Sequence, residues 1–262
     1  MTAIVVRQVN VPLHGLPPCA EGFCIAQLSD LHLRRWGRDE QHLQDLLAHL
    51  PCDTLLITGD FGHDPEGFER TAELMRRLLA PVRPPLGIYG VLGNHDRAVL
   101  ADQELPLTLL RNELRLINVG AFEYYLGGIE QTEGHRSTVS EAIGELPDDA
   151  PVVVMAHYPS TVFELPVGAG ALMLAGHTHG GQIRLPGLGC LWTNDELPRS
   201  MARGLHAAHG NWLHVSPGTG VSGPLPVRWL CPPELTVLRL RRAARIRQEP
   251  RITSRAAVST AA

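Results

Sequence analysis

Five short motifs of this 262-residue chain pair acidic, amide or imidazole side chains at spacings that suit metal binding. In chain order they are Asp30-Leu31-His32, Gly59-Asp60, Gly93-Asn94-His95-Asp96, His157 and Gly176-His177-Thr178-His179. An isolated Asp-x-His pair is weak evidence, since about 0.5 occurrences are expected by chance in a chain of this length and composition. The Gly-Asn-His-Asp run is far more specific, because about one chain per thousand of this composition would contain it by chance.

The candidate ligands are two carboxylates, one carboxamide and four imidazoles: Asp30, His32, Asp60, Asn94, His157, His177 and His179. Such a mixture of oxygen and nitrogen donors suits borderline divalent ions such as Mn²⁺, Fe²⁺ or Zn²⁺. Seven donors are too many for one closed tetrahedral site. A pair of ions that share one bridging carboxylate would use them all.

Each motif follows an apolar run of strand length, and ligands of open α/β sheets lie outside the carboxyl ends of strands. These expected strands are 23–28, 54–58, 86–92, 152–156 and 171–175. Apolar spacing predicts helices over 39–50 and 65–79, the second capped by Asp64 ahead of Pro65. Strand-like runs at 114–119, 124–129, 212–216 and 235–240 predict a second sheet. Residues 1–22 read as a short lead-in that contains prolines.

Composition narrows the possible chemistry. All 23 basic residues are arginine, so P-loop and Schiff-base lysine mechanisms are excluded. The net charge of −4, with no basic cluster within residues 23–240, gives no nucleic-acid footprint and disfavours a nuclease. Five cysteines without a Cys-x-x-Cys pair fit a reducing compartment, and residues 1–20 show no export signal, so we expect a cytoplasmic protein with no transmembrane segment.

At these motifs, over roughly residues 23–240, the sequence resembles the calcineurin-like metallophosphoesterases. The family's blocks are Asp-x-His, Gly-Asp, Gly-Asn-His-Asp/Glu, His and Gly-His-x-His, in this order. The run from Gly176 to Ile183 is similar to a bacterial subgroup of YaeI-like or YkuE-like phosphodiesterases. The resemblance implies a four-layer αββα sandwich in which helices flank two mixed sheets. We expect residues 1–240 to form one domain and the arginine-rich residues 241–262 to form a disordered tail.

The resemblance also implies a role for each motif residue. One metal would be held by Asp30, His32, Asp60 and His179, and the other by Asp60, Asn94, His157 and His177, with Asp60 bridging them. A hydroxide between the two ions, manganese being our first expectation and iron or zinc the others, would attack phosphorus. His95 would protonate the leaving group, and Asp96 would orient His95.

The most specific function predicted is a phosphodiesterase acting on a small phosphoester. A protein phosphatase fits less well, because the Gly-Asp-x-x-Asp-Arg-Gly run of that subfamily is replaced here by residues 59–64. Two alternatives stay open: a pyrophosphatase acting on a nucleotide-diphosphate lipid precursor, and a metal-binding module without turnover. Arg97 is the first candidate for substrate contact, ahead of Arg34, Arg35 and Arg184. The natural substrate, the metal and the oligomeric state do not follow from the sequence.

Overall fold

Two six-stranded sheets form most of the protein, which a computed structural model describes at residues 3–63, 67–96, 100, 103–130, 138–223 and 227–243. The first sheet has the order β1 (Val5–His14), β14 (Glu234–Ala243), β2 (Cys24–Leu28), β3 (Thr54–Thr58), β4 (Ile88–Val91) and β5 (Thr108–Leu109). The second has the order β12 (Gly204–Ala208), β13 (Asn211–Val215), β9 (Leu172–Ala175), β8 (Val152–Ala156), β7 (Glu123–Ile129) and β6 (Glu113–Asn118). Both mix parallel and antiparallel pairs, as predicted.

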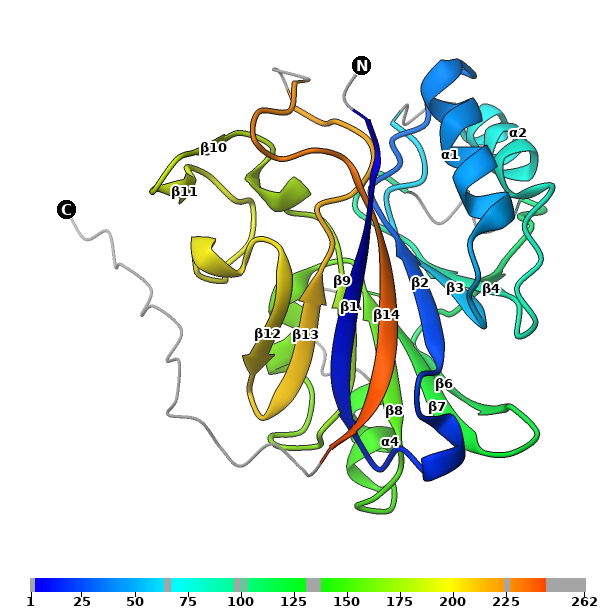
Figure 1. Cartoon of the computed structure of the whole chain (residues 1–262), viewed down its shortest axis with the longest axis vertical. Helices are drawn as coiled ribbons and strands as arrows, with labels where there is room; N and C mark the ends of the chain where they lie inside the picture. Colours follow the sequence, from blue (N-terminus) through cyan, green and yellow to red (C-terminus); the bar gives the residue numbers. More distant parts are fainter. Residues whose placement is uncertain are drawn as a thin grey trace.

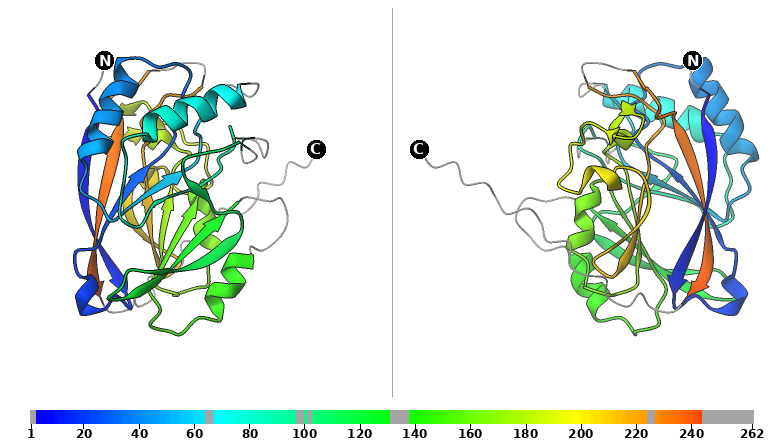
Figure 2. Two further views of the ribbon diagram at one scale, coloured as in Figure 1. Left: turned by 90° about the vertical axis from the view of Figure 1, so that its right-hand side faces the viewer. Right: turned by 60° about the vertical axis from the view of Figure 1, so that its left-hand side comes forward.

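The two sheets pack face to face. Ile25 and Leu56 of the first sheet share one buried cluster with Val153 and Leu172 of the second. In Figure 2 the blue and orange strands β1 and β14 stand on one side and the green and yellow strands of the second sheet on the other. The side chains of this central layer are removed from water by both sheets. Burying one large apolar side chain stabilises the fold by about 1.5–3 kcal/mol relative to leaving it exposed.

Helices cover the outer faces, which gives the four predicted layers. The helices α1 (Arg38–His49) and α2 (Phe68–Leu79) bury Leu43, Leu47, Met75 and Leu78 against the first sheet. Helix α4 (Thr138–Gly144) and the turn η2 (Pro159–Phe163) cover the second. The hairpin β10 (Arg184–Leu185) and β11 (Gly189–Cys190) lies outside both sheets, at the same end of the molecule as the amino-terminal end of α1 (Figure 1).

Most expected elements agree with the structure to within two residues at each end, and three regions differ by more. Residues 5–14 are not a lead-in but an edge strand, which pairs in parallel with β14 over its whole length. Strand β14 continues to Ala243, three residues beyond the expected end at residue 240, because it stays paired with β1 as far as His14. Glu21 also accepts bonds from the Arg241 side chain and the Arg242 amide. Helix α2 starts at Phe68 after Gly67, and the expected cap at Asp64 and Pro65 lies outside the described residues. Residues 244–262, the remainder of the expected tail, also lie outside them.

Among the residues that the structure describes, no helix is long and apolar enough to cross a bilayer. The cytoplasmic location stays a prediction.

A buried polar bridge joins the two sheets below their carboxyl ends. Gln27 of β2 donates to the carbonyl of Ala175 in β9 (2.9 Å) and accepts from Nδ1 of His214 in β13 (2.6 Å). Gln27 and His214 are both fully buried. Burial, with smaller contributions from His206 and Arg7, lowers the pKa of His214 to about 3. The imidazole is therefore neutral in the folded protein at neutral pH.

We expect His214 to make the fold sensitive to acid. The unfolded chain takes up a proton at His214 below about pH 6.5, whereas the folded chain does not until about pH 3. Its contribution to stability is thus present above pH 6.5 and lost as the pH falls, by roughly 1.5 kcal/mol between pH 6.5 and 5. Denaturant unfolding of the chelator-treated protein across this range should show a shallower pH dependence for His214→Gln than for the parent. The exposed His42→Gln variant is the control, and equal slopes for parent and His214→Gln would contradict the assignment.

Candidate metal centre

The five motifs meet at one edge of the sandwich, because β2, β3 and β4 are mutually parallel in the first sheet and β8 and β9 are parallel in the second. Asp30 and Asp60 follow β2 and β3, and His157 follows β8 directly. The carboxyl ends of the two sheets therefore deliver the candidate ligands from opposite sides into one buried space.

Asp60 lies at the centre of this space. Its Oδ2 is 3.5 Å from Nε2 of His32 and 3.4 Å from Nε2 of His157, and its Oδ1 accepts the backbone N–H of His95 (2.9 Å). Burial alone would raise the pKa of Asp60, but His157, His32 and the His95 amide together lower it well below its usual value. Burial opposes the charge on His157, but its contact with Asp60, helped by Asp30 and the Thr58 carbonyl, raises the pKa of His157 to about 9.

One group of donors gathers beside Asp60 around Asn94. Oδ1 of Asn94 is 3.0 Å from Nε2 of His157 and 2.9 Å from Nδ1 of His177. The far ring nitrogens of the two histidines donate to backbone carbonyls: Nδ1 of His157 to Thr58 (2.8 Å) and Nε2 of His177 to Asn194 (3.0 Å). With its distal nitrogen bonded to a carbonyl, each ring directs its other nitrogen inward, as metal-binding histidines do.

A second group gathers on the other side of Asp60. Nε2 of His32 and Nε2 of His179 are 3.1 Å apart, and Nε2 of His179 is 3.5 Å from Oδ1 of Asp30. Burial lowers the pKa values of His32 and His179 to about 3 and raises that of Asp30. Asp30 also accepts bonds from the Ser29 hydroxyl and the His177 amide, which hold its carboxylate in place.

The two groups fit a pair of cations. The donor atoms of Asp30, His32 and His179 lie within 4.8 Å of one another, as do those of Asp30, Asp60 and His157. Imidazole nitrogens that lie this close to one another and to buried carboxylates suit a shared positive ion. All seven predicted ligands thus lie around one space, with Asp60 between the two groups.

The backbone at the ligands is strained. Five of the seven, Asp30, His32, Asp60, His177 and His179, have φ between +44° and +66°, a region that non-glycine residues seldom adopt. The motif glycines allow this close approach. A Cβ on Gly93 would collide with the Asp60 carboxylate, and one on Gly176 would collide with the side chains of Ser29 and Asp30.

His95 and Asp96 take different positions from those expected as a pair. His95 lines the cavity of about 480 Å³ that also contains Asp60, Asn94, His177 and His179. The Asp96 carboxylate, however, accepts the backbone N–H groups of Phe61 (3.0 Å) and Gly93 (2.9 Å). Among the hydrogen bonds of the described residues, none joins Asp96 to the His95 ring. Burial, with the nearby charge of Asp60, raises the pKa of Asp96 to about 7. Asp96 therefore ties the second motif to the third, and its role as an orienting partner of His95 stays a prediction.

His63 is a site residue that the sequence interpretation missed. Its ring stacks on that of His95 (centroids 5.7 Å, 15°), and its donor atom lies within 4.8 Å of those of His32 and His95. Nε2 of His63 is 2.6 Å from Nη2 of Arg34. The sequence signal that could have identified it is its position, three residues after Asp60.

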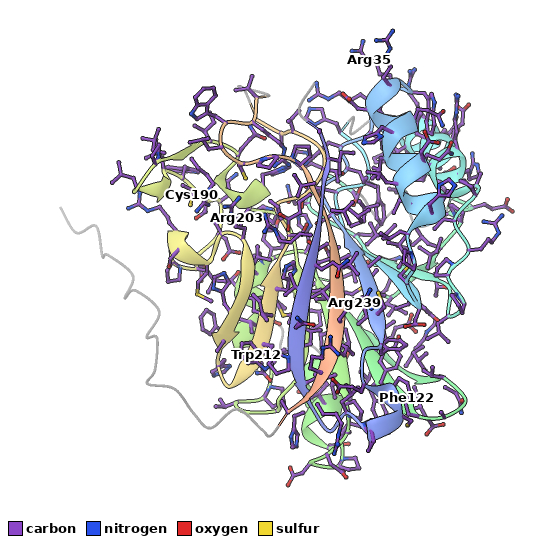
Figure 3. The ribbon with its side chains drawn as sticks, viewed as in Figure 1. Arg35, Phe122, Cys190, Arg203, Trp212 and Arg239 are labelled. Carbon is purple, nitrogen blue, oxygen red and sulfur yellow. The ribbon has the colours of Figure 1, made fainter. Side chains whose placement is uncertain are left out.

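The arginines predicted to contact substrate lie in different parts of the molecule. Arg97 lies outside the described residues. Arg35 projects outward near the start of α1 (Figure 3), and Arg184 donates to the Gly180 carbonyl (2.8 Å). Among the aromatic side chains, Tyr158 packs on the His177 ring (centroids 4.3 Å), whereas Trp36 packs under Arg77 on the helical face.

Comparison with known proteins agrees with the motifs. The family model described as Calcineurin-like phosphoesterase matches residues 24–181. The chain is 29% identical over 243 residues to an uncharacterized metallophosphoesterase, YkoQ, of Bacillus subtilis, with 89% of each chain covered. It is 25% identical to the uncharacterized metallophosphoesterase YkuE of the same organism, with 86% of this chain and 82% of the relative covered. The UDP-2,3-diacylglucosamine pyrophosphatase LpxG of Chlamydia trachomatis is 26% identical, with 87% of this chain and 84% of the relative covered.

We expect Gly93→Ala to lose metal, because the added methyl group collides with the Asp60 carboxylate. Elemental analysis after reconstitution with manganese should show at least one ion fewer per chain than in the parent. Gly144→Ala is the matched control, since a Cβ there meets only Pro166 at 3.9 Å. Full metal content in folded Gly93→Ala would show that this carboxylate position is not needed.

Proposed function

We propose that this chain acts on phosphodiesters through a dinuclear centre bridged by Asp60. The premise is that the chain belongs to the calcineurin-like phosphoesterase family and is a metal-dependent phosphoric ester hydrolase. The observation that carries the proposal is the position of the Asp60 carboxylate between His32 and His157. Each histidine belongs to a different group of donors and comes from a different sheet.

One ion would be held by Asp30, His32, Asp60 and His179, and the other by Asp60, Asn94, His157 and His177. When bound, such a pair supplies a water of lowered pKa as nucleophile and neutralises the charge that develops on the phosphoryl oxygens. Manganese is the ion we propose, because mixed carboxylate, carboxamide and imidazole donors suit a borderline cation.

His95 is the proposed proton donor to the leaving oxygen. Its backbone N–H is bonded to Asp60, so its position is coupled to the centre, while its ring faces the same cavity as His177 and His179. The stack with His63 restricts the plane of the ring. A group that reaches the cavity without being one of the seven donors can hold a proton for the departing alkoxide.

The cavity itself favours a diester over a monoester. No arginine is among the described residues that line it. A monoester dianion would call for more compensating cations than a diester monoanion. The absence of the protein-phosphatase run from residues 59–64 points in the same direction.

A pyrophosphatase is the second candidate, and it rests on the relative LpxG, whose name states cleavage of UDP-2,3-diacylglucosamine. Hydrolysis of a nucleotide-diphosphate lipid faster than of any simple diester would favour it. A module without turnover is less consistent with a chain that keeps all seven donors and His95.

The diesterase proposal predicts that bis-p-nitrophenyl phosphate is cleaved with a higher kcat/KM than p-nitrophenyl phosphate by the manganese-loaded protein. The comparison holds the leaving group constant, so the ratio reports recognition of the second ester. A monoester preference of tenfold, about 1.4 kcal/mol of transition-state discrimination, would count against the proposal.

The role of His95 predicts a dependence on the leaving group. His95→Asn should keep both metals and lose about 10² to 10⁴-fold in rate on alkyl phosphodiesters, whose leaving alkoxide needs a proton. It should lose distinctly less on p-nitrophenyl esters, whose leaving group is stable without one. The exposed His42→Asn variant is the control. If log rate depends on leaving-group pKa no more steeply in His95→Asn than in the parent, the proton comes from another group.

A further inference from the structure

Large exposed apolar side chains are concentrated beside the candidate centre. Of the nine among the described residues, six lie on two segments, at 188–192 and 227–230, and we call them the apolar rim. They are Leu188, Leu191, Trp192, Val227, Trp229 and Leu230. The two tryptophans are 73% and 61% exposed, although tryptophan normally buries most of its surface.

The two segments form one unit. Strand β10 pairs with β11, and Ile183 just before β10 bridges Trp229 in parallel. The Arg184 amide donates to the Trp229 carbonyl (2.9 Å), and the Trp229 amide donates to Gln182 (3.0 Å). Figure 3 shows Cys190 within this unit at the end of the molecule where the sheets deliver the ligands. The rim is thus held by regular backbone bonds rather than by burial of its side chains.

The rim continues into the catalytic cavity. The cavity of about 480 Å³ that contains His95, His177 and His179 is walled on its other side by Ile183, Leu191 and Trp192. Trp192 is bonded to the centre through Asn194: the indole N–H donates to its side chain (2.6 Å), and the Asn194 carbonyl accepts from His177. The indole is therefore held at the mouth of the cavity with its hydrogen-bonding group already satisfied.

An apolar surface of this kind at the mouth of a polar site has a chemical meaning. Exposed apolar patches mark binding sites, because covering them with an apolar ligand removes their surface from water and lowers the free energy of the complex. The ligand that reaches both surfaces at once has a phosphoester at one end and an apolar group at the other. Arg199, which donates to the Leu191 carbonyl (3.0 Å), places a cation at the edge of the rim, where it can contact an anionic headgroup.

We propose that the apolar rim binds the alkyl or acyl chain of an amphiphilic phosphoester whose phosphate lies among the candidate ligands. This inference rests on the proposed function for the position of the phosphate, and it adds the substrate class. The chain could be supplied from a bilayer or by a dispersed monomer, and the two sources differ in which rim residues they engage. Trp192 and Leu191 line the cavity, while Leu188 and Trp229 face outward and would be reached first by a lipid surface.

The first test measures binding without turnover. The metal-loaded protein is titrated calorimetrically with methyl decylphosphonate and with methyl methylphosphonate, both below the critical micelle concentration. The decyl compound should bind at least tenfold more tightly. Leu191→Ala should reduce this preference by threefold or more and leave the affinity for methyl methylphosphonate within twofold, and Trp192→Ala should reduce the preference at least as much. The exposed Leu116→Ala on β6 is the matched control, and Trp192→Phe should keep most of the preference because it keeps an apolar ring.

The second test repeats the comparison by hydrolysis of methyl and decyl p-nitrophenyl phosphodiesters. A decyl preference that falls in Trp192→Ala supports the inference. If Leu188→Ser and Trp229→Ser slow only decyl ester embedded in phosphatidylcholine vesicles, the chain is taken from a bilayer, and if neither slows it, from the monomer. Equal binding of the two phosphonates, or equal loss of both in Leu191→Ala, would overturn the inference, as would a dimer in sedimentation that Trp229→Ser dissociates. Decyl-selective binding without hydrolysis of either ester would refute the proposed function and leave the rim assignment standing.

Discussion

The contact on which the rest of the structure depends is that of one Asp60 oxygen with two histidines from opposite sheets. His32 follows β2 of the first sheet, and His157 follows β8 of the second, so the carboxylate can lie near both only if the two sheets keep their carboxyl ends level. The apolar layer between the sheets fixes their separation, and the Gln27–His214 bridge fixes their register a few residues below the centre. A small shift of one sheet over the other would separate the two groups of donors.

Strain at the ligands is the second feature of this arrangement. Left-handed backbone at five of the seven donors costs stability, of order 1–3 kcal/mol each, and persists only because surrounding contacts determine it. Those contacts can be named: Asp96 binds amides of the second and third motifs, and Asp30 binds the amide of His177. The carboxylates therefore act on the backbone as well as on the centre. Donors held in advance lose little freedom when a cation or a substrate binds.

The sequence predicted most of what local patterns determine. The strands that end in polar motifs and the helices over 39–50 and 65–79 follow from apolar runs and the polar residues that bound them. The four layers follow from the family resemblance. Strand β1 did not, because it is an edge strand with only its last residues buried and Pro12 within it, and its partner β14 lies more than 200 residues away. The contacts of Asp96 and the stack of His63 on His95 depend on how two loops meet, which spacing along the chain does not encode. The apolar rim was missed for the same reason, since its two segments are neighbours only through the bridge from Ile183 to Trp229.

The central claim is that Asp60 is shared by two cations, and the most direct test is a crystal structure of the manganese-loaded protein with anomalous difference maps. The account predicts two manganese peaks per chain, both ligated by the Asp60 carboxylate, one also by His32 and His179 and the other by His157, His177 and Asn94. A single peak, or two peaks of which only one is ligated by Asp60, would contradict it.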